Sequence, residues 1–407
     1  MSNSVPEGWN IYSLDELGQV VGGGTPESNN TDYWGGDIYW ATPKEITKLS
    51  SRYINKTERT ITQDGLDRSS AKLHPIGTIL LTSRASVGYP AINTIPMATN
   101  QGFQSLRPNN KLDTEYGYQC LLNSRNKLEK LSAGSTFLEI SSKEVKKFKV
   151  VIPPLPEQKK IAAILTSVDT VIEKTQAQID KLKDLKTGMM QELLTKGIGH
   201  IEFKDSPVGR IPVEWEVKTI GDLANVKRGA SPRPIKDKKW WGGNVGWIRI
   251  SDVTASSKYL NKTTQYLSSE GVSKSIQIPK GEVILSICAT IGRPIIINVD
   301  ACIHDGFVWF DKLNGSIDRE YWYYFLASKE SFLSAQRQSG TQGNLNTTIV
   351  SELICPLPPT SEQKKIASIL SSIDKNVEEM QHKLLQTKSI KKALMQDLLT
   401  GKVRVKV

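Results

Sequence analysis

The sequence predicts an α+β protein in which two globular domains alternate with two long helices that pair as an antiparallel coiled coil. A long internal repeat is the first observation. Residues 157–165 read EQKKIAAIL and return 205 positions later, at 362–370, as EQKKIASIL. At the same shift, MQELLT at 190–195 returns as MQDLLT at 395–400. A repeat of this length indicates a duplicated domain, because solenoid units repeat every 20–50 residues.

The second observation is that apolar residues in each copy recur at alternating spacings of four and three. Such a heptad pattern favours a coiled coil of about 40 residues, roughly 60 Å long. The apolar positions are Ile161, Leu165, Val168, Ile172, Ile179, Leu182, Met189 and Leu193, then Ile366, Leu370, Ile373, Val377, Met380, Leu384, Leu394 and Leu398. Thr175 and Lys186 interrupt the first stripe, and Thr387 and Lys391 interrupt the second. The alternative is that each stripe packs only onto its own domain.

Both helices have start and stop signals. Pro156 suits a first helical turn, and Thr360 with Gln363 suggests a capping box. Gly197 and Gly401 stand where the helices are expected to end.

The third observation is that the remaining sequence consists of short β-branched and aromatic runs between Gly, Pro and Asn. Strands are expected at 38–41 and 77–82, and at 245–250 and 281–286 in the second copy. Helices are expected at 114–131 and 319–337. The predicted division is a first domain at 1–152, a first helix at 153–197, a connector at 198–210, a second domain at 211–357, and a second helix with the tail at 358–407.

Composition limits the functional classes. The formal net charge of +11 favours a polyanionic partner such as nucleic acid, and we expect most of the excess on the globular parts. No apolar run reaches 18 residues, so no membrane contact is expected, and no secretion signal is visible at the N-terminus. The four cysteines form no CxxC pair. We therefore expect no structural metal and a reducing, cytoplasmic location.

Catalytic motifs are missing from the sequence. It contains no GxxxxGK[ST], HExxH or GxSxG pattern, and no Asn-Pro-Pro-aromatic or Asp-Pro-Pro-aromatic motif of amino-methyltransferases. The chain is therefore predicted not to be an enzyme by itself.

The repeated helix sequences and the variable domains before them resemble the specificity (S) subunits of type I restriction–modification systems. The Pro-x-x-Trp entries at 6–9 and 212–215 resemble the start of that family's target-recognition domains, as do the loops GGTP at 23–26 and GASP at 229–232. The resemblance covers essentially the whole chain.

The resemblance implies that each recognition domain reads one half of a bipartite double-stranded DNA target. The paired helices would set the spacer and dock two methyltransferase (M) subunits, and restriction (R) subunits would join through the complex. No cofactor is expected in this chain. S-adenosylmethionine would be bound by the methyltransferase subunits, and ATP with Mg²⁺ by the restriction subunits.

Polar residues that differ between the two domains are the candidate DNA contacts. In the major groove, Arg suits guanine and Asn or Gln suits adenine, so Arg84, Gln101, Arg249 and Gln342 are favoured for bases. Lys44, Lys143, Lys227, Arg228 and Arg233 suit phosphates. The other candidates are Thr42, Ser83, Ser135, Thr136, Ser251, Arg293, His304, Thr341 and Asn344.

Two other functions agree with parts of the sequence. A coiled-coil adaptor whose domains bind proteins would explain the heptads but not the net positive charge. A nuclease with a cryptic metal site would cleave DNA alone in the presence of a divalent metal.

Overall fold

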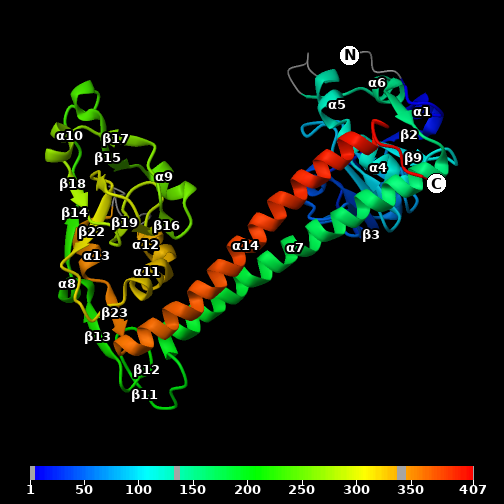
Figure 1. The fold of residues 1–407 in the computed structure, drawn as a ribbon. Coiled ribbons are helices and arrows are strands. Elements are labelled where there is room, and N and C mark those ends of the chain that lie inside the picture. Colours follow the sequence, from blue (N-terminus) through cyan, green and yellow to red (C-terminus); the bar gives the residue numbers. More distant parts are fainter. Residues whose placement is uncertain (1–4, 133–137, 337–344, 407) are drawn as a thin grey trace. The chain divides into compact units, whose positions relative to one another are not determined.

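The computed structural model describes residues 5–132, 138–336 and 345–406. Its contacts divide the chain into two compact units (Figure 1). The first unit comprises residues 1–179 and 380–407, and the second comprises residues 180–379. Each unit therefore contains one globular domain together with part of each long helix, whereas the sequence-based division follows the repeat.

The described residues of the first unit form three sheets. Its elements are β1 (Asn10–Ser13), α1 (Leu14–Leu17), β2 (Gly18–Gly22), η1 (Thr31–Tyr33), β3 (Trp34–Ala41), α2 (Pro43–Lys48), β4 (Tyr53–Ile54), β5 (Thr60–Ile61), α3 (Gln63–Asp67), β6 (Ile79–Leu81), β7 (Pro90–Asn93), β8 (Met97–Thr99), β9 (Gln104–Pro108), α4 (Thr114–Asn123), α5 (Arg125–Leu131), α6 (Ser142–Lys147) and β10 (Lys149–Ile152). The sheets have the orders β2-β9-β6-β7-β4, β5-β3-β8 and β1-β10.

The second unit repeats this plan. Its elements are β11 (Phe203–Lys204), β12 (Ile211–Pro212), β13 (Glu216–Thr219), α8 (Ile220–Leu223), β14 (Asn225–Arg228), η2 (Lys238–Trp240), β15 (Trp241–Ile248), α9 (Ile250–Ala255), β16 (Tyr259–Leu260), β17 (Gln265–Leu267), α10 (Ser269–Ser273), β18 (Ile276–Ile278), β19 (Val283–Ser286), β20 (Pro294–Ile297), β21 (Ala301–Ile303), β22 (Phe307–Asp311), α11 (Arg319–Ser328), α12 (Glu330–Gln336), α13 (Thr347–Ser351) and β23 (Ile354–Leu357). The sheet β14-β22-β19-β20-β16 corresponds to the five-stranded sheet of the first unit, and β17-β15-β21-β18 corresponds to its three-stranded sheet with one strand added.

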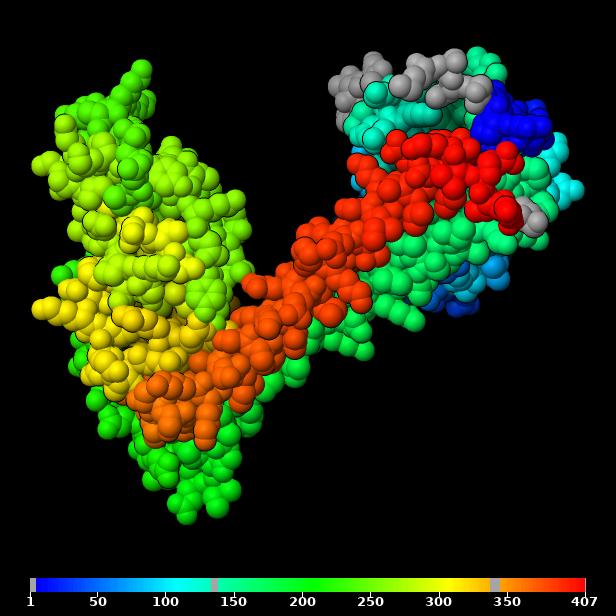
Figure 2. All heavy atoms as spheres, viewed as in Figure 1, coloured from blue at the N-terminus to red at the C-terminus, as the bar shows by residue number. Residues whose placement is uncertain are grey.

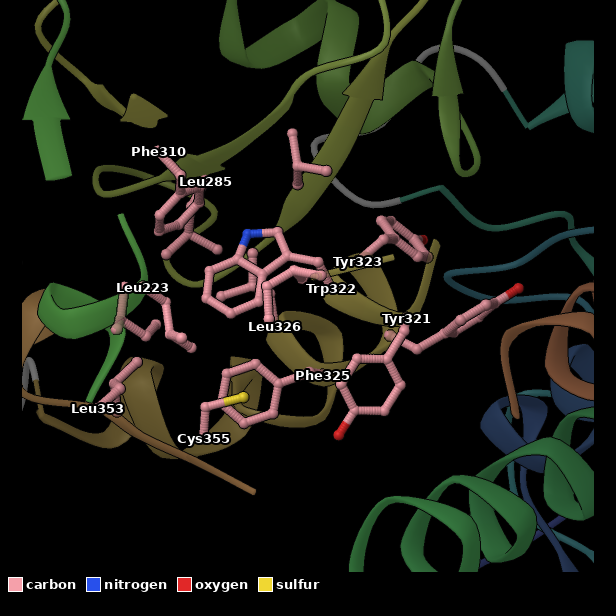
Figure 3. Packing of buried hydrophobic residues seen from close by; sticks show 14 of the residues in the cluster. Leu223, Leu285, Phe310, Tyr321, Trp322, Tyr323, Phe325, Leu326, Leu353 and Cys355 are labelled. Atoms are coloured by element: carbon pink, nitrogen blue, oxygen red, sulfur yellow. The ribbon is translucent and has the colours of Figure 1, made fainter. Parts of the chain in front are cut away.

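The largest core of the second unit forms around α11, where six consecutive residues from Tyr321 to Leu326 are buried. The Trp322 ring meets Phe310 edge-on, with ring centroids 5.2 Å apart (Figure 3). This core includes Leu193 of the first long helix and Ile366 of the second. The helices are therefore part of the hydrophobic core and help to stabilise the domain.

The two long helices, α7 (Leu155–Lys196) and α14 (Thr360–Leu398), pair antiparallel as predicted. In the first unit, Leu165 near the start of α7 shares a core with Leu398 at the end of α14. Figure 2 shows these last turns of α14 beside the first part of α7. In the second unit, Leu193 near the end of α7 shares a core with Leu370 near the start of α14. Both stripes also pack on the adjoining domains, so pairing and domain packing coexist.

The two lysines that interrupt the heptads make equivalent ion pairs between the helices. Lys391 Nζ lies 2.7 Å from Asp169 Oδ1 in the first unit, and Lys186 Nζ lies 2.6 Å from Asp374 Oδ1 in the second. Both pairs are related by the 205-residue repeat. A buried polar pair of this kind favours one helix register over others.

Each of these aspartates also binds the neighbouring domain. Gln119 Nε2 of α4 donates to Asp169 Oδ2 at 2.6 Å, and the Tyr324 hydroxyl of α11 donates to Asp374 Oδ2 at the same distance. One carboxylate in each unit thus joins the domain to both helices.

The Pro-x-x-Trp entries are joined to the helix starts. The Trp9 indole donates to Glu157 Oε2 at 3.2 Å, and the Trp215 indole donates to Glu362 Oε2 at 3.0 Å. In the first unit, Arg404 Nε also donates to Glu157 Oε1 at 2.8 Å. The hydrogen bonds from Arg404 and Trp9 favour the charged carboxylate and lower the pKa of Glu157, although burial opposes this shift.

The predicted helix ends need one correction. Gly197 follows α7 directly with φ +67°, and Gly401 lies shortly after α14 with φ +69°, as glycine stop signals do. The capping box at the start of α14 is wrong, because Pro359 accepts the backbone N–H groups of Glu362 and Gln363. The Thr360 hydroxyl instead donates to the Ser316 carbonyl at 2.8 Å.

The two shorter helices predicted in the domains are also corrected. Residues 114–131 form α4 and α5, separated at Ser124, and the equivalent segment forms α11 and α12, separated at Lys329. Arg337, the end predicted for the second helix, lies outside the described residues. The connector at 198–210 contains β11, which pairs with β12.

Candidate nucleic-acid interface

Four loops converge at one edge of the strands in the first unit. They follow β2, β3, β6 and β8, and backbone hydrogen bonds tie them together. Gly24 N donates to Thr99 O at 2.9 Å, Asn100 N to Ala41 O at 3.0 Å, and Ser83 N to Gly102 O at 2.7 Å. Since β3 and β8 are parallel neighbours, their carboxyl ends meet at the same edge.

The second unit has equivalent loops after β14, β15, β19 and β21. In both units, these four loops and the backbone hydrogen bonds between them are called the loop frame. Ala230 N donates to Ile303 O at 3.2 Å, and Ile287 N donates to Gly306 O at 2.9 Å. The strands β15 and β21 are again parallel neighbours, with Ile248 opposite Ile303.

The glycines of the Gly-rich loops are required by close backbone approach. A Cβ atom on Gly23 would lie 1.9 Å from Asn100 O, and one on Gly229 would lie 2.2 Å from His304 O. Neither position can hold a side chain without moving the opposing loop. The first part of the GGTP and GASP motifs therefore has a structural role.

The hydroxyl that follows these glycines makes an equivalent bond in both units. Thr25 donates to the side-chain oxygen of Gln101, and Ser231 Oγ donates to Asp305 Oδ1 at 2.6 Å. The loop frame is therefore repeated, while the side chain that accepts this hydrogen bond is the amide of Gln101 in one unit and the carboxylate of Asp305 in the other. Although burial opposes the shift, this hydrogen bond and the charge of Arg233 lower the pKa of Asp305.

A hollow of about 400 Å³ lies among these loops in the second unit. It brings together four residues predicted from the sequence, namely Arg233, Arg249, Ser251 and His304. Its other side chains include Ser231, Trp247 and Asp305. The hollow therefore contains hydrogen-bond donors, acceptors and aromatic surface on a frame of fixed backbone.

The His304 ring is held as a neutral donor. Its Nδ1 accepts the Gly306 N–H at 2.8 Å, and the ring centroid lies 4.7 Å from that of Phe307. Burial lowers the pKa of His304, with Asp305 opposing and Arg249 adding to the shift. Because Nδ1 is the acceptor, Nε2 carries the proton.

A family model described as the type I restriction modification DNA specificity domain matches residues 6–184 and 212–388. The chain belongs to this family. Each match covers one copy of the frame described above and most of the helix that follows it.

Two curated relatives are similar to the chain along nearly their whole length. The chain is 29% identical over 418 residues to the type I restriction enzyme MjaIX specificity subunit of Methanocaldococcus jannaschii, covering 98% of this chain and 95% of that protein. It is 26% identical over 419 residues to the MjaVIII specificity subunit of the same organism, covering 99% and 94%.

Solved structures share the fold. The type I restriction–modification S subunit from M. genitalium superposes with a TM-score of 0.59 at 15% identity, covering 98% of both chains. A chain from a structure concerned with complex assembly and conformational transition of the type I R-M system gives a TM-score of 0.60 at 18% identity, covering 98% of this chain and all of that one.

The residues predicted as DNA contacts in the first unit differ in exposure and in bonding. Lys44 and Gln101 are exposed at the edge of the loops. The Thr42 hydroxyl is bonded to Glu45 Oε2 at 2.7 Å, where it caps α2. Arg84 is also exposed, with its Nε 2.7 Å from Glu139. Ser83 is only 1% exposed, so its hydroxyl does not reach the surface.

Four other predicted cations lie on a helix or are already bonded within their own unit. Lys143 is exposed on α6, which packs against α1 at the start of β2. Lys227 Nζ lies 2.5 Å from Asp311 Oδ2. Arg228 Nε donates to the Asp305 carbonyl at 2.6 Å, and Arg293 donates to the Ser256 carbonyl at 2.9 Å. Ser135, Thr136, Thr341, Gln342 and Asn344 lie outside the described residues.

Three exposed lysines near the hollow were not among the residues predicted from the sequence. Lys236, Lys238 and Lys239 occupy the same loop as Arg233, between β14 and β15. The corresponding loop of the first unit, residues 27–33, contains no lysine or arginine. The sequence does contain a pattern that could have predicted this basic loop, because residues 233–239 include four Lys and Arg.

Neither a metal cluster nor a membrane-spanning helix is found among the described residues. No group of three or more His, Cys, Asp or Glu side chains there could hold a metal ion. Among the helices of this same part of the chain, none is long and apolar enough to cross a membrane.

Proposed function

We propose that the chain is the DNA specificity subunit of a type I restriction–modification complex, with each domain reading one half of a bipartite target. The repeated loop frame is the observation that carries this proposal. Equivalent backbone positions hold Gln101 in one unit and Asp305 in the other, and Thr42 in one and Arg249 in the other. A shared frame with different polar groups suits the reading of two different base sequences.

The cations of the second unit provide the complementary contacts to the DNA backbone. The exposed loop that contains Arg233, Lys236, Lys238 and Lys239 borders the hollow. Phosphate contacts of this kind set the position and register of a protein on DNA, while groove contacts specify the bases.

The helix pair is proposed to set the spacer and to dock two methyltransferase subunits. Leu185 and Ile390 occupy equivalent positions of the two helices and are 51% and 56% exposed. An apolar side chain exposed at the same position of both copies suits two copies of one partner. The named relatives are themselves subunits of type I restriction enzymes.

In this proposal the chain selects DNA and its partners perform the chemistry. Methyltransferase subunits would use S-adenosylmethionine to modify adenine, and restriction subunits would use ATP and Mg²⁺ to cleave. This division agrees with the absence of the common catalytic motifs from the sequence.

The test is to co-express the chain with its neighbouring methyltransferase subunit and to map methylation of host DNA at base resolution. We expect adenine methylation at one bipartite motif that disappears when the chain is omitted. If no new mark appears while the same methyltransferase is active with another specificity chain, the proposal fails and the adaptor function is favoured.

A further inference from the structure

We infer that Arg249 reads a guanine in the half-site bound by the second unit, an inference that rests on the proposed function. It goes beyond that function by assigning one side chain to one kind of base pair. It also predicts that the first unit reads its half-site without an equivalent contact.

The arginines of the loops that form the second-unit hollow differ in whether their guanidinium groups are already bonded. Arg228 is bonded to the Asp305 carbonyl, Arg233 Nη2 lies 3.1 Å from Asp305 Oδ2, and Arg293 is bonded to the Ser256 carbonyl. By contrast, no oxygen of the described chain accepts a hydrogen bond from the guanidinium of Arg249, which is exposed and lines the hollow. Arg249 therefore retains all its side-chain donors for a ligand.

The backbone of Arg249 is fixed, although its guanidinium is free. Arg249 N donates to Asp252 Oδ2 at 2.9 Å, and Asp252 is itself 5% exposed. The other oxygen of Asp252 accepts the Thr264 hydroxyl at 2.8 Å. A buried carboxylate thus sets the direction in which the side chain leaves the end of β15, so less freedom is lost on binding.

The chemistry of the guanidinium favours a guanine as its ligand. The planar guanidinium presents two parallel N–H donors, which match O6 and N7 of guanine in the major groove. Arg249 lies beside Trp247 and His304 inside the hollow, whereas the lysines lie on the bordering loop. This placement favours a base edge for Arg249 and phosphates for the lysines.

The equivalent position of the first unit excludes the same contact there. Thr42 stands in place of Arg249, and its hydroxyl is already bonded to Glu45. The two units therefore offer different donors from the same position of the same frame.

The experiment maps methylation in host DNA for the wild-type chain, Arg249→Ala and Arg249→Lys, each co-expressed with the methyltransferase subunit. A good bidentate contact discriminates by roughly ten- to one-hundred-fold between bases. We expect both variants to lose this preference at one G·C pair of one half-site, with the other half-site unchanged. Lysine keeps the charge but not the guanidinium geometry, so Arg249→Lys is expected to give more methylation than Arg249→Ala without regaining the preference.

A matched control removes a similar charge from the same unit. Lys280 is exposed just before β19, whereas the loops of the hollow follow that strand. Lys280→Ala is expected to keep the wild-type motif.

Three results would overturn the inference. They are an unchanged motif in Arg249→Ala, a fully wild-type motif in Arg249→Lys, and loss of all methylation by both variants while their circular dichroism melting curves match the wild type. The second result would assign Arg249 to a phosphate, and the third would assign it to overall binding or assembly. Failure of the wild-type chain to direct methylation would instead overturn the proposed function.

Discussion

Burial keeps the imidazole of His74 neutral in the first unit. The residue is fully buried, and its Nε2 lies 3.3 Å from Thr99 Oγ1, directly before the Asn100 loop of the candidate interface. Burial, with a smaller contribution from Arg107, lowers the pKa of His74 from 6.5 to about 4. The unfolded chain therefore binds a proton between these two pH values while the folded chain does not.

This difference predicts how stability depends on pH. The contribution of His74 is fully present above pH 6.5 and is lost as the pH falls towards 4, by about 3 kcal/mol in total. His74→Gln is expected to flatten this part of the curve, because an amide does not titrate. The measurement is the free energy of unfolding in urea at pH 7, 5.5 and 4. The exposed His382→Gln variant is the control, and an equally steep curve for His74→Gln would contradict the prediction.

Individual contacts show why only part of the candidate site could be predicted from sequence. Arg249 and His304 could be predicted by comparing the polar residues of equivalent loops in the two repeats. These loops are short and follow recognisable strands. Ser83 was chosen by the same argument but is buried, since it bonds across to Gly102. Arg293 turns to the Ser256 carbonyl, 37 positions away, a contact that no local pattern indicates.

The ion pairs between the helices are buried, so the loss of one partner is expected to lower the stability of the fold. Asp169 and Lys391 are both largely buried, with side chains 12% and 11% exposed. Removing one partner of such a pair leaves a buried charge and typically costs about 3–5 kcal/mol, whereas replacing both by apolar residues is often neutral.

A double-mutant cycle on this pair is therefore predicted to be strongly non-additive. Asp169→Leu and Lys391→Met alone should each lower the free energy of unfolding by several kcal/mol, and the double variant should recover most of this loss. Unfolding in urea provides the measurement. The exposed pair Glu192 and Lys196 is the control, since its removal should cost below about 1 kcal/mol. Additive losses at Asp169 and Lys391 would show that the pair is not coupled.

The exposed apolar residues of the helices give a prediction about partners. Leu185→Asp places a charge on one proposed docking surface and leaves Ile390, its equivalent, intact. We expect native mass spectrometry of the assembled complex to change from two methyltransferase subunits to one, and the double variant with Ile390→Asp to bind none. Asp184→Asn, at the neighbouring exposed position, should leave two bound. Two subunits bound to the double variant would place the docking surface elsewhere.

The long helices and main strands were predictable because their periodicity extends over many residues. The breaks at Ser124 and Lys329 were not predicted, although both lie in short polar stretches, at 123–127 and 328–331. Apolar residues resume after each break, and Leu128 and Leu333 are buried in the cores, so the pattern resembled one continuous helix. The start of α14 was also predicted from a local pattern, the capping box of Thr360 and Gln363. In the structure the Thr360 hydroxyl instead donates to the Ser316 carbonyl, 44 positions away.

The distribution of charge along the chain corrects an expectation from composition. Residues 358–407 contain ten Lys and Arg against five Asp and Glu, so nearly half of the net charge of +11 lies in the second helix and tail. The excess is therefore not concentrated on the globular domains. The local basic loop at Arg233 is a better indicator of a DNA-binding surface than the total charge.

The continuous helices lead to the last prediction, which concerns the spacing of the two half-sites. The two contact units divide α7 after Ile179 and α14 after Glu379, so residues inserted at both points would pair with each other and leave the contacts within each unit intact. One heptad in each helix adds about 10 Å, or about three base pairs of DNA at roughly 3.4 Å each. Seven residues also preserve the heptad register, which keeps the apolar stripes facing each other.

We therefore expect the double insertion to lengthen the spacer of the methylated motif by about three base pairs while both half-site sequences stay the same. The same heptad inserted in α7 alone is the control, because it shifts one helix past the other and should reduce both stability and methylation. If the double insertion is folded and methylates DNA with the original spacer, the helices do not set the distance. A change in the half-site sequences would show instead that base reading depends on the helices, because the loop frames themselves are untouched by the insertion.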